Sequence, residues 1–207
     1  MRPLKLLGTL LMFSAALGLW GTASSAQTTN PVIEMHNYAV TYFSGNKSSN
    51  PDETLRVVNT GDIGDVDLPS GDICVNVYVF DANQEMTECC SCPDSANGML
   101  TFSVQKNLTA NTLTSIPLPT GVIKVTASVP GSGGTCSPTT LANLPAEDVL
   151  AAWQSHLNPA PSGISVTEDE LATVPLSLSE ATDLTQDCTD AIELGSGHGV
   201  CTCPAIM

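Results

Sequence analysis

Apolar and polar side chains alternate along several short segments of this chain, and the clearest alternation covers residues 73–80. Odd positions there carry Ile or Val, whereas even positions carry Cys, Asn, Tyr and Phe. A period of two residues is typical of a β-strand, whose successive side chains point to opposite faces of a sheet. Similar runs, separated by turns rich in Gly, Pro, Asn and Asp, predict further strands over residues 32–43, 54–59, 85–92, 99–104 and 122–127.

Residues 82–84 have the composition of a tight turn and would return the chain antiparallel to the strand at 73–80. That pairing sets Cys74 opposite Cys92 and permits a disulfide between them. A shift of one residue in the register would remove this bridge.

The pattern changes to a helical one in the last third of the chain. Residues 145–157 are predicted to form a helix that has proline at its first position and ends before Pro159. A second helix is predicted over residues 180–194, where apolar side chains, Cys188 among them, recur every three or four residues. The acidic run at residues 168–170 fits the negative first turn of a further short helix.

Together these elements predict a mainly β protein with C-terminal helices. We expect residues 27–130 to form an antiparallel, immunoglobulin-like β-sandwich and residues 131–207 to form a helical segment packed on it. Short strands with regularly spaced turns favour this fold class, and the cysteines would staple it with disulfides.

Residues 1–26 have the three parts of a secretory signal peptide. Two basic residues precede an apolar stretch at 6–20, and small residues at Ser24 and Ala26 mark a cleavage point. The apolar stretch is shorter than the roughly 20 residues that span a bilayer, and no later stretch is long enough either. The sequence therefore predicts a secreted or extracytoplasmic protein, extracellular or periplasmic, with no transmembrane segment after signal removal.

The chain is strongly acidic, with 21 Asp and Glu against six Lys and Arg and a formal net charge of −15. Phosphate binding needs a surface of Lys and Arg that releases counterions, so this charge argues against nucleic acid as a partner. It argues equally against attachment to anionic lipid. We expect a protein or surface partner, which the sequence does not identify.

All eight cysteines lie after the predicted signal peptide, and an even number in an exported protein predicts disulfides. Cys89 and Cys90 are neighbours in a predicted strand, so their side chains point to opposite faces and need different partners. Cys188, on the apolar face of a predicted helix, would tie that helix to the β core. The disulfide candidates are Cys74, Cys89, Cys90, Cys92, Cys136, Cys188, Cys201 and Cys203.

Two kinds of metal site are alternatives. Thiolates at residues 89–92 and 201–203 could bind zinc, although their spacers of zero or one residue are shorter than those of zinc knuckles. Calcium fits better, because an acidic, Gly-containing loop could present hard carboxylate oxygens. The loop departs from the EF-hand pattern, and the plainer interpretation is a solvated acidic connection. Its calcium candidates are Asp62, Asp65, Asp67 and Asp72.

Two stretches, residues 72–93 and 195–203, contain the motifs Cys-Cys-x-Cys-Pro and Gly-Ser-Gly-His-Gly-x-Cys-x-Cys. In these stretches the chain resembles a family of uncharacterised secreted acidobacterial proteins, and the similarity would cover most of residues 50–203. The resemblance implies export and a shared cysteine framework. It implies no activity and no functional residue.

The sequence offers little for catalysis. Nucleophilic hydrolysis needs a Ser or Cys beside a His base and an orienting acid, and the chain has three histidines, His36, His156 and His198. No Gly-x-Ser-x-Gly motif occurs, and Ser196 lies two residues from His198 in a Gly-rich stretch typical of a helix stop. We therefore expect a non-enzymatic, secreted interaction or surface-associated structural module, with no cofactor apart from the calcium alternative. The alternatives are an extracellular calcium-binding protein and a secreted hydrolase.

Overall fold

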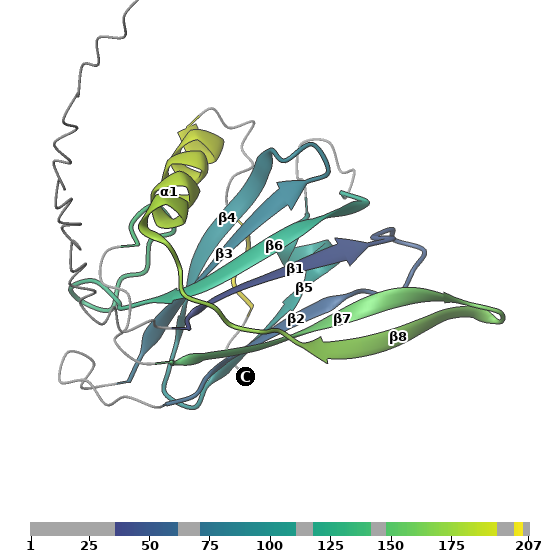
Figure 1. Cartoon of the computed structure of the whole chain (residues 1–207), viewed down its shortest axis with the longest axis horizontal. Coiled ribbons are helices and arrows are strands. Elements are labelled where there is room, and N and C mark those ends of the chain that lie inside the picture. Colours follow the sequence, from purple (N-terminus) through teal and green to yellow (C-terminus); the bar gives the residue numbers. More distant parts are fainter. Residues whose placement is uncertain (1–35, 62–70, 111–117, 142–147, 194–200, 205–207) are drawn as a thin grey trace, which may run out of the picture. The chain divides into compact units, whose positions relative to one another are not determined.

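The computed structural model describes residues 36–61, 71–110, 118–141, 148–193 and 201–204, all of which belong to one compact unit (Figure 1). The predicted signal peptide, residues 1–26, lies outside this part of the chain. Within the described residues, no helix is long and apolar enough to cross a membrane.

The described strands form two four-stranded sheets in which all neighbours are antiparallel. The first sheet has the order β1-β6-β3-β4, with β1 (Tyr38–Ser44), β6 (Thr120–Ser128), β3 (Ile73–Asp81) and β4 (Met86–Asp94). The second sheet has the order β5-β2-β7-β8, with β5 (Met99–Ser103), β2 (Thr54–Asn59), β7 (Leu150–Ala160) and β8 (Gly163–Glu170). The predicted antiparallel, mainly β architecture is confirmed.

The inner faces of the two sheets share one hydrophobic core. In β3 the apolar positions of the alternating pattern, Ile73, Val75, Val77 and Val79, are all fully buried there, together with side chains of the second sheet such as Leu55. Each such side chain stabilises the fold by roughly 1.5–3 kcal/mol when it leaves water. The alternation that predicted this strand therefore also marks the surface that holds the sheets together.

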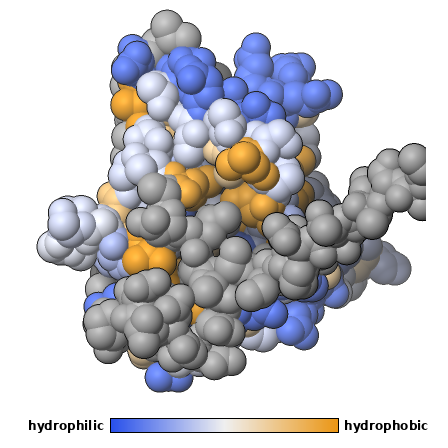
Figure 2. Space-filling model, turned by 60° about the vertical axis from the view of Figure 1, so that its left-hand side comes forward, coloured by the Kyte–Doolittle hydropathy of each residue, from blue (hydrophilic) through white to orange (hydrophobic). Residues whose placement is uncertain are grey.

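The other face of the first sheet is covered by α1 (Leu178–Glu193), which confirms the helix predicted over residues 180–194 (Figure 1). Leu184 and Cys188 of this helix are buried in a second apolar cluster with Tyr78 of β3. Because both faces of β3 are covered, its even positions are buried as well as its odd ones. Figure 2 shows hydrophilic residues, in blue, gathered over the upper part of the face that includes the helix.

The start of α1 is anchored by polar contacts. The Ser177 hydroxyl accepts a hydrogen bond from Glu180 N–H at 3.1 Å, as expected for a helix cap. The Glu180 carboxylate accepts hydrogen bonds from Lys124 Nζ at 2.6 Å and from Tyr38 OH at 2.8 Å. Burial opposes ionisation of Glu180, but these two hydrogen bonds and the charge of Lys124 together hold its pKa below the ordinary value.

Two predicted helices are wrong. Residues 150–157 lie in β7, and the acidic run at 168–170 lies at the end of β8. Acidic residues near a helix start stabilise a helix by typically about 1 kcal/mol at most. β7 instead pairs with strands on both sides and places Leu150 and Ala152 in the core, and these contacts outweigh the local preference. The segment 131–207 thus contributes two strands to the second sheet as well as α1.

Candidate functional site

The hairpin β7–β8 carries an uncovered edge strand. β8 is the last strand of the second sheet, pairs with β7 on one side only, and has all eight residues exposed. Its register runs from Ala160 opposite Gly163 to Trp153 opposite Glu170. Gly163 follows the turn with φ +132°, a conformation that other residues rarely adopt. Figure 1 shows this hairpin, in light green, extending beyond the rest of the sandwich.

The outer edge of β8 presents backbone groups that no described strand pairs with. In an antiparallel ladder, hydrogen-bonded and non-hydrogen-bonded residue pairs alternate. Leu171 N–H donates to Ala152 O at 2.9 Å, which fixes the odd-numbered residues of β8 as those bonded to β7. The N–H and C=O groups that point away from β7 therefore belong to Ile164, Val166, Glu168 and Glu170.

The side chains of these same four residues lie on the outer face of the second sheet. Even-numbered residues of β7 point into the core, so its odd-numbered residues point outward, and the register places the four β8 residues opposite those odd-numbered residues. Ile164 is 43% and Val166 52% exposed, and residues 168–170 are exposed and acidic. The Arg56 guanidinium on β2 donates a hydrogen bond to Glu168 and forms an ion pair with it. The edge has an apolar half near the turn and an acidic half farther along.

The opposite side of the sandwich, where β4 and β5 are the outermost strands, is closed by the C-terminal segment 201–204. Cys201 N–H donates to Cys89 O at 3.2 Å, and Thr202 N–H donates to Asn107 O at 3.0 Å. Asn107 belongs to the single helical turn that follows β5, Val104–Leu108. The segment therefore bridges the two sheets at this side.

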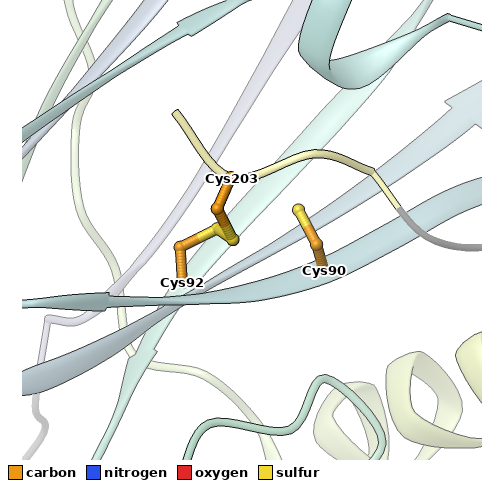
Figure 3. A group of neighbouring side chains, drawn as sticks. All are labelled: Cys90, Cys92 and Cys203. Atoms are coloured by element: carbon orange, nitrogen blue, oxygen red, sulfur yellow. A yellow bond between two sulfur atoms is a disulfide. The ribbon is translucent and has the colours of Figure 1, made fainter. Parts of the chain in front are cut away.

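Two disulfides fix this segment to β4 covalently, Cys90–Cys201 and Cys92–Cys203. Figure 3 shows Cys92 bonded to Cys203 with Cys90 beside them, and the three sulfur atoms lie within 4.8 Å of one another. All eight cysteines of the chain form disulfides, so none presents the thiolate that a zinc site requires. In this structure the sulfur cluster is a covalent staple.

The predicted Cys74–Cys92 bridge is wrong, because Cys74 is bonded to Cys136. The cause is the register between β3 and β4, which places Cys74 opposite Pro93, one residue from the predicted partner. Successive residues of a strand point to opposite faces of the sheet. Pro93, opposite Cys74, shares its face, so Cys92 points to the opposite face from Cys74.

The prediction that Cys89 and Cys90 need different partners is confirmed. Cys89 is bonded to Cys188 of α1 on the outer face of the first sheet, and Cys90 is bonded to Cys201 on the inner face. The expected covalent tie between the helix and the β core is therefore present.

His156 on β7 is buried beneath the ring of Tyr42, and the two ring centroids lie 4.4 Å apart. Its Nδ1 atom has no hydrogen-bond partner among the described residues. Burial lowers the pKa of His156, although the charge of Asp169 acts in the opposite direction. The neighbouring Ser155 hydroxyl accepts a hydrogen bond from Thr54 N–H at 2.6 Å. The structure thus places this serine in a backbone contact rather than beside the imidazole as a nucleophile.

Glu53 is a second buried titratable group at the same end of the sandwich. Its carboxylate accepts hydrogen bonds from Leu157 N–H at 3.0 Å and from Ser44 N–H at 3.4 Å. Burial raises the pKa of Glu53 despite these hydrogen bonds, which lower it. The contacts join the end of β1 to β7, so the carboxylate links the two sheets.

Several candidate residues from the sequence lie outside the described part of the chain, namely Asp62, Asp65, Asp67, Ser196 and His198. The fourth calcium candidate, Asp72, directly precedes β3, and the calcium site stays a prediction. His36 is described, and its backbone N–H donates to the Asp148 carboxylate at 2.6 Å.

The sequence pattern does not predict the β8 edge, because the acidic run at residues 168–170 favours the start of a helix. The signal that identifies the strand is the Pro-Ser-Gly turn at 161–163, followed by alternating β-branched and hydroxyl side chains at 164–167. Edge position itself carries no local signal, since it depends on the order of strands in the sheet.

Comparison with known proteins assigns no family. No protein-family model matches the chain, and no curated protein matches it. A solved structure from Thermotoga maritima, titled "Crystal Structure of Thermotoga maritima 1070", is similar with a TM-score of 0.38 and 10% identity, over 66% of this chain and 93% of that chain. A similarity at this level carries no inference about function, which therefore rests on the geometry.

Proposed function

We propose that this protein is a secreted, non-enzymatic interaction module that binds a protein partner through the edge of β8. The observation that carries the proposal is the contrast between the two sides of the sandwich. β4 is stapled to the C-terminal segment by two disulfides, whereas all eight residues of β8 are exposed. Proteins usually protect a free strand edge because it pairs with other chains, so an edge left open on a cross-linked scaffold favours a role in binding.

The surroundings of His156 support a non-enzymatic role. Its imidazole is buried against Tyr42, its pKa is lowered, and the adjacent Ser155 hydroxyl is used by Thr54. A general base needs hydrogen-bond access to the proton that it removes. A stacked, buried histidine of this kind is better explained by a role in packing than by a role in catalysis.

Export and the immunoglobulin-like assignment are parts of the same proposal. The predicted signal at residues 1–26 supports export, and four disulfides are compatible with an oxidising compartment outside the cytosol. The immunoglobulin-like topology stays a prediction, because several classes of sandwich consist of two antiparallel sheets.

A photoreactive phenylalanine in place of Ile164 tests the proposal in the cells that export the protein. We expect a discrete covalent adduct with a partner protein, because this side chain is 43% exposed at the proposed edge. The same substitution at Gln186, exposed on α1, is the matched control and should not give that adduct. The same adduct from both positions, or no adduct from either, would contradict the proposal. Hydrolase activity that Ile164 variants retain and that His156→Gln abolishes would contradict it as well.

A further inference from the structure

We infer that the partner binds as an extended segment, basic in its N-terminal half, that adds to the second sheet as an antiparallel strand beside β8. This inference rests on the proposed function and specifies the class of ligand. The second sheet has four strands and ends at β8, so an added strand would continue the order β5-β2-β7-β8 without displacing any described element. Main-chain hydrogen bonds give affinity in this binding mode, and side chains at alternate positions give specificity.

The backbone of β8 fixes the register that such a strand can use. Outward N–H and C=O groups occur at every second residue from Ile164 to Glu170, which is the repeat that a neighbouring antiparallel strand requires. Residues 165, 167 and 169 are bonded to β7 instead. A segment of about seven residues would therefore cover the whole open edge.

The side chains of β8 fix the chemistry of the partner. Side chains directly opposite each other in an antiparallel pair interact, so β-branched residues fit opposite Ile164 and Val166, and Lys or Arg fits opposite Glu168 and Glu170. Asp169 adds a third carboxylate on the other face of the strand, also exposed. An antiparallel segment meets Glu170 first, which places its basic residues in its N-terminal half and its β-branched residues in its C-terminal half.

A second copy of this chain fits the edge less well. If two β8 strands paired antiparallel through their outward N–H and C=O groups, Ile164 would lie opposite Glu170 and Val166 opposite Glu168. Each copy would then remove carboxylates from water against uncharged side chains. Each copy also carries a formal charge of −15 before signal removal, which opposes self-association.

The probe is a capped synthetic peptide, Lys-Lys-Arg-Thr-Val-Thr-Val, which follows this pattern from Glu170 to Ile164. We expect a labelled form to bind the oxidised, mature protein in a fluorescence anisotropy titration, with affinity that falls as salt is added. The matched control has the same composition in the order Val-Lys-Thr-Arg-Val-Lys-Thr, which leaves Val opposite Glu170 and Thr opposite Glu168 in place of the basic residues. We expect the control to bind at least about tenfold more weakly, since it loses several favourable cross-strand pairs.

A backbone variant tests strand addition separately from charge. Val166→Pro removes one outward N–H while leaving the bonds between β7 and β8, and proline is tolerated at such positions of an edge strand. We expect peptide binding to weaken by about tenfold or more, because one ladder hydrogen bond is lost and the ring obstructs its neighbour. Val166→Thr keeps the N–H and the β-branched shape, so this variant should bind the peptide within about twofold of wild type. Thermal unfolding of both variants shows whether each still folds.

A charge variant tests the acidic half of the edge and remains informative if the proline variant fails to fold. Asp169→Asn with Glu170→Gln should weaken peptide binding by about fivefold at low salt and reduce its salt dependence. Asp183→Asn with Glu193→Gln removes the same groups from exposed positions on α1 and should leave binding within about twofold of wild type.

Three results would overturn the inference. Equal binding of the two peptides would show that the order of their residues does not matter. Equal losses of peptide affinity in the two charge variants would show non-specific electrostatic attraction. Dimerisation that Val166→Pro abolishes would make a second copy of the chain the occupant of the edge. An adduct from Ile164 to a partner without a basic strand would overturn the ligand class and leave the proposed function standing. Absence of that adduct removes the proposed function itself.

Discussion

Replacing both Cys74 and Cys136 by alanine is expected to lower the free energy of unfolding by about 4 kcal/mol, more than removal of any other single disulfide. The bond closes a loop with a sequence separation of 62 residues. The other three disulfides provide no shorter covalent path between its ends. A loop of this length restricts the unfolded chain strongly, and its release stabilises the unfolded state.

The other three disulfides overlap along the sequence, so each closes a shorter covalent loop than its sequence separation suggests. Cys89–Cys188 and Cys90–Cys201 have separations of 99 and 111 residues, but Cys89 and Cys90 are adjacent. With Cys90–Cys201 intact, loss of Cys89–Cys188 opens a loop of only about 15 residues, which corresponds to roughly 3 kcal/mol.

Cys92–Cys203 should contribute less than Cys74–Cys136 or Cys89–Cys188, because both of its ends lie two residues from the ends of Cys90–Cys201. Its loop has only a few residues, and we expect a loss of about 2 kcal/mol or less. Denaturant unfolding of the three double-alanine variants, without reductant, measures these differences. Equal losses in all three, or the largest loss for Cys92–Cys203, would contradict this dependence on the length of the covalent loop.

Glu88→Gln is expected to stabilise the protein by on the order of 3 kcal/mol at about pH 8 and to change little at about pH 4. Glu88 on β4 is 6% exposed and lies opposite Val79, a core residue. Burial raises its pKa from 4.5 to about 7. The folded state therefore holds this proton more firmly than the unfolded state, and stability falls as the pH rises from about 4.5 to about 7.

The control for this experiment is Glu85→Gln, an exposed position in the turn between β3 and β4. We expect this variant to keep the wild-type difference in unfolding free energy between about pH 4 and about pH 8, whereas Glu88→Gln should alter that difference. Chemical denaturation at the two pH values gives the measurement. If Glu88→Gln and wild type lose the same stability on going to high pH, the buried carboxyl is not the cause.

The strands of the first sheet could be predicted because core burial imposes a period of two on their own residues. β3 and β6 lie within two residues of their predicted ranges, 73–80 and 122–127. β7 could not be predicted in this way, since its central position depends on pairing with β2, almost a hundred residues earlier. Its local composition favours a helix, and only the distant partners reverse that preference.

The candidate site shows the same division between local and long-range information. The opposite directions of Cys89 and Cys90 follow from strand geometry alone, and the structure confirms them. The partner of Cys74 depends on a register that shifts at the irregularity between Val79 and Phe80, which no local pattern specifies. The open edge at β8 depends on strand order, which the sequence does not state.

Residue-resolved amide hydrogen exchange along β8, in the free oxidised protein, tests the open edge most directly. The N–H groups of residues 165, 167 and 169 are bonded to β7 and should exchange slowly. Those of residues 164, 166, 168 and 170 point outward and should exchange rapidly, giving an alternating pattern along the strand. Slow exchange at all of these positions would show that the edge is already covered and would contradict its role as the binding site.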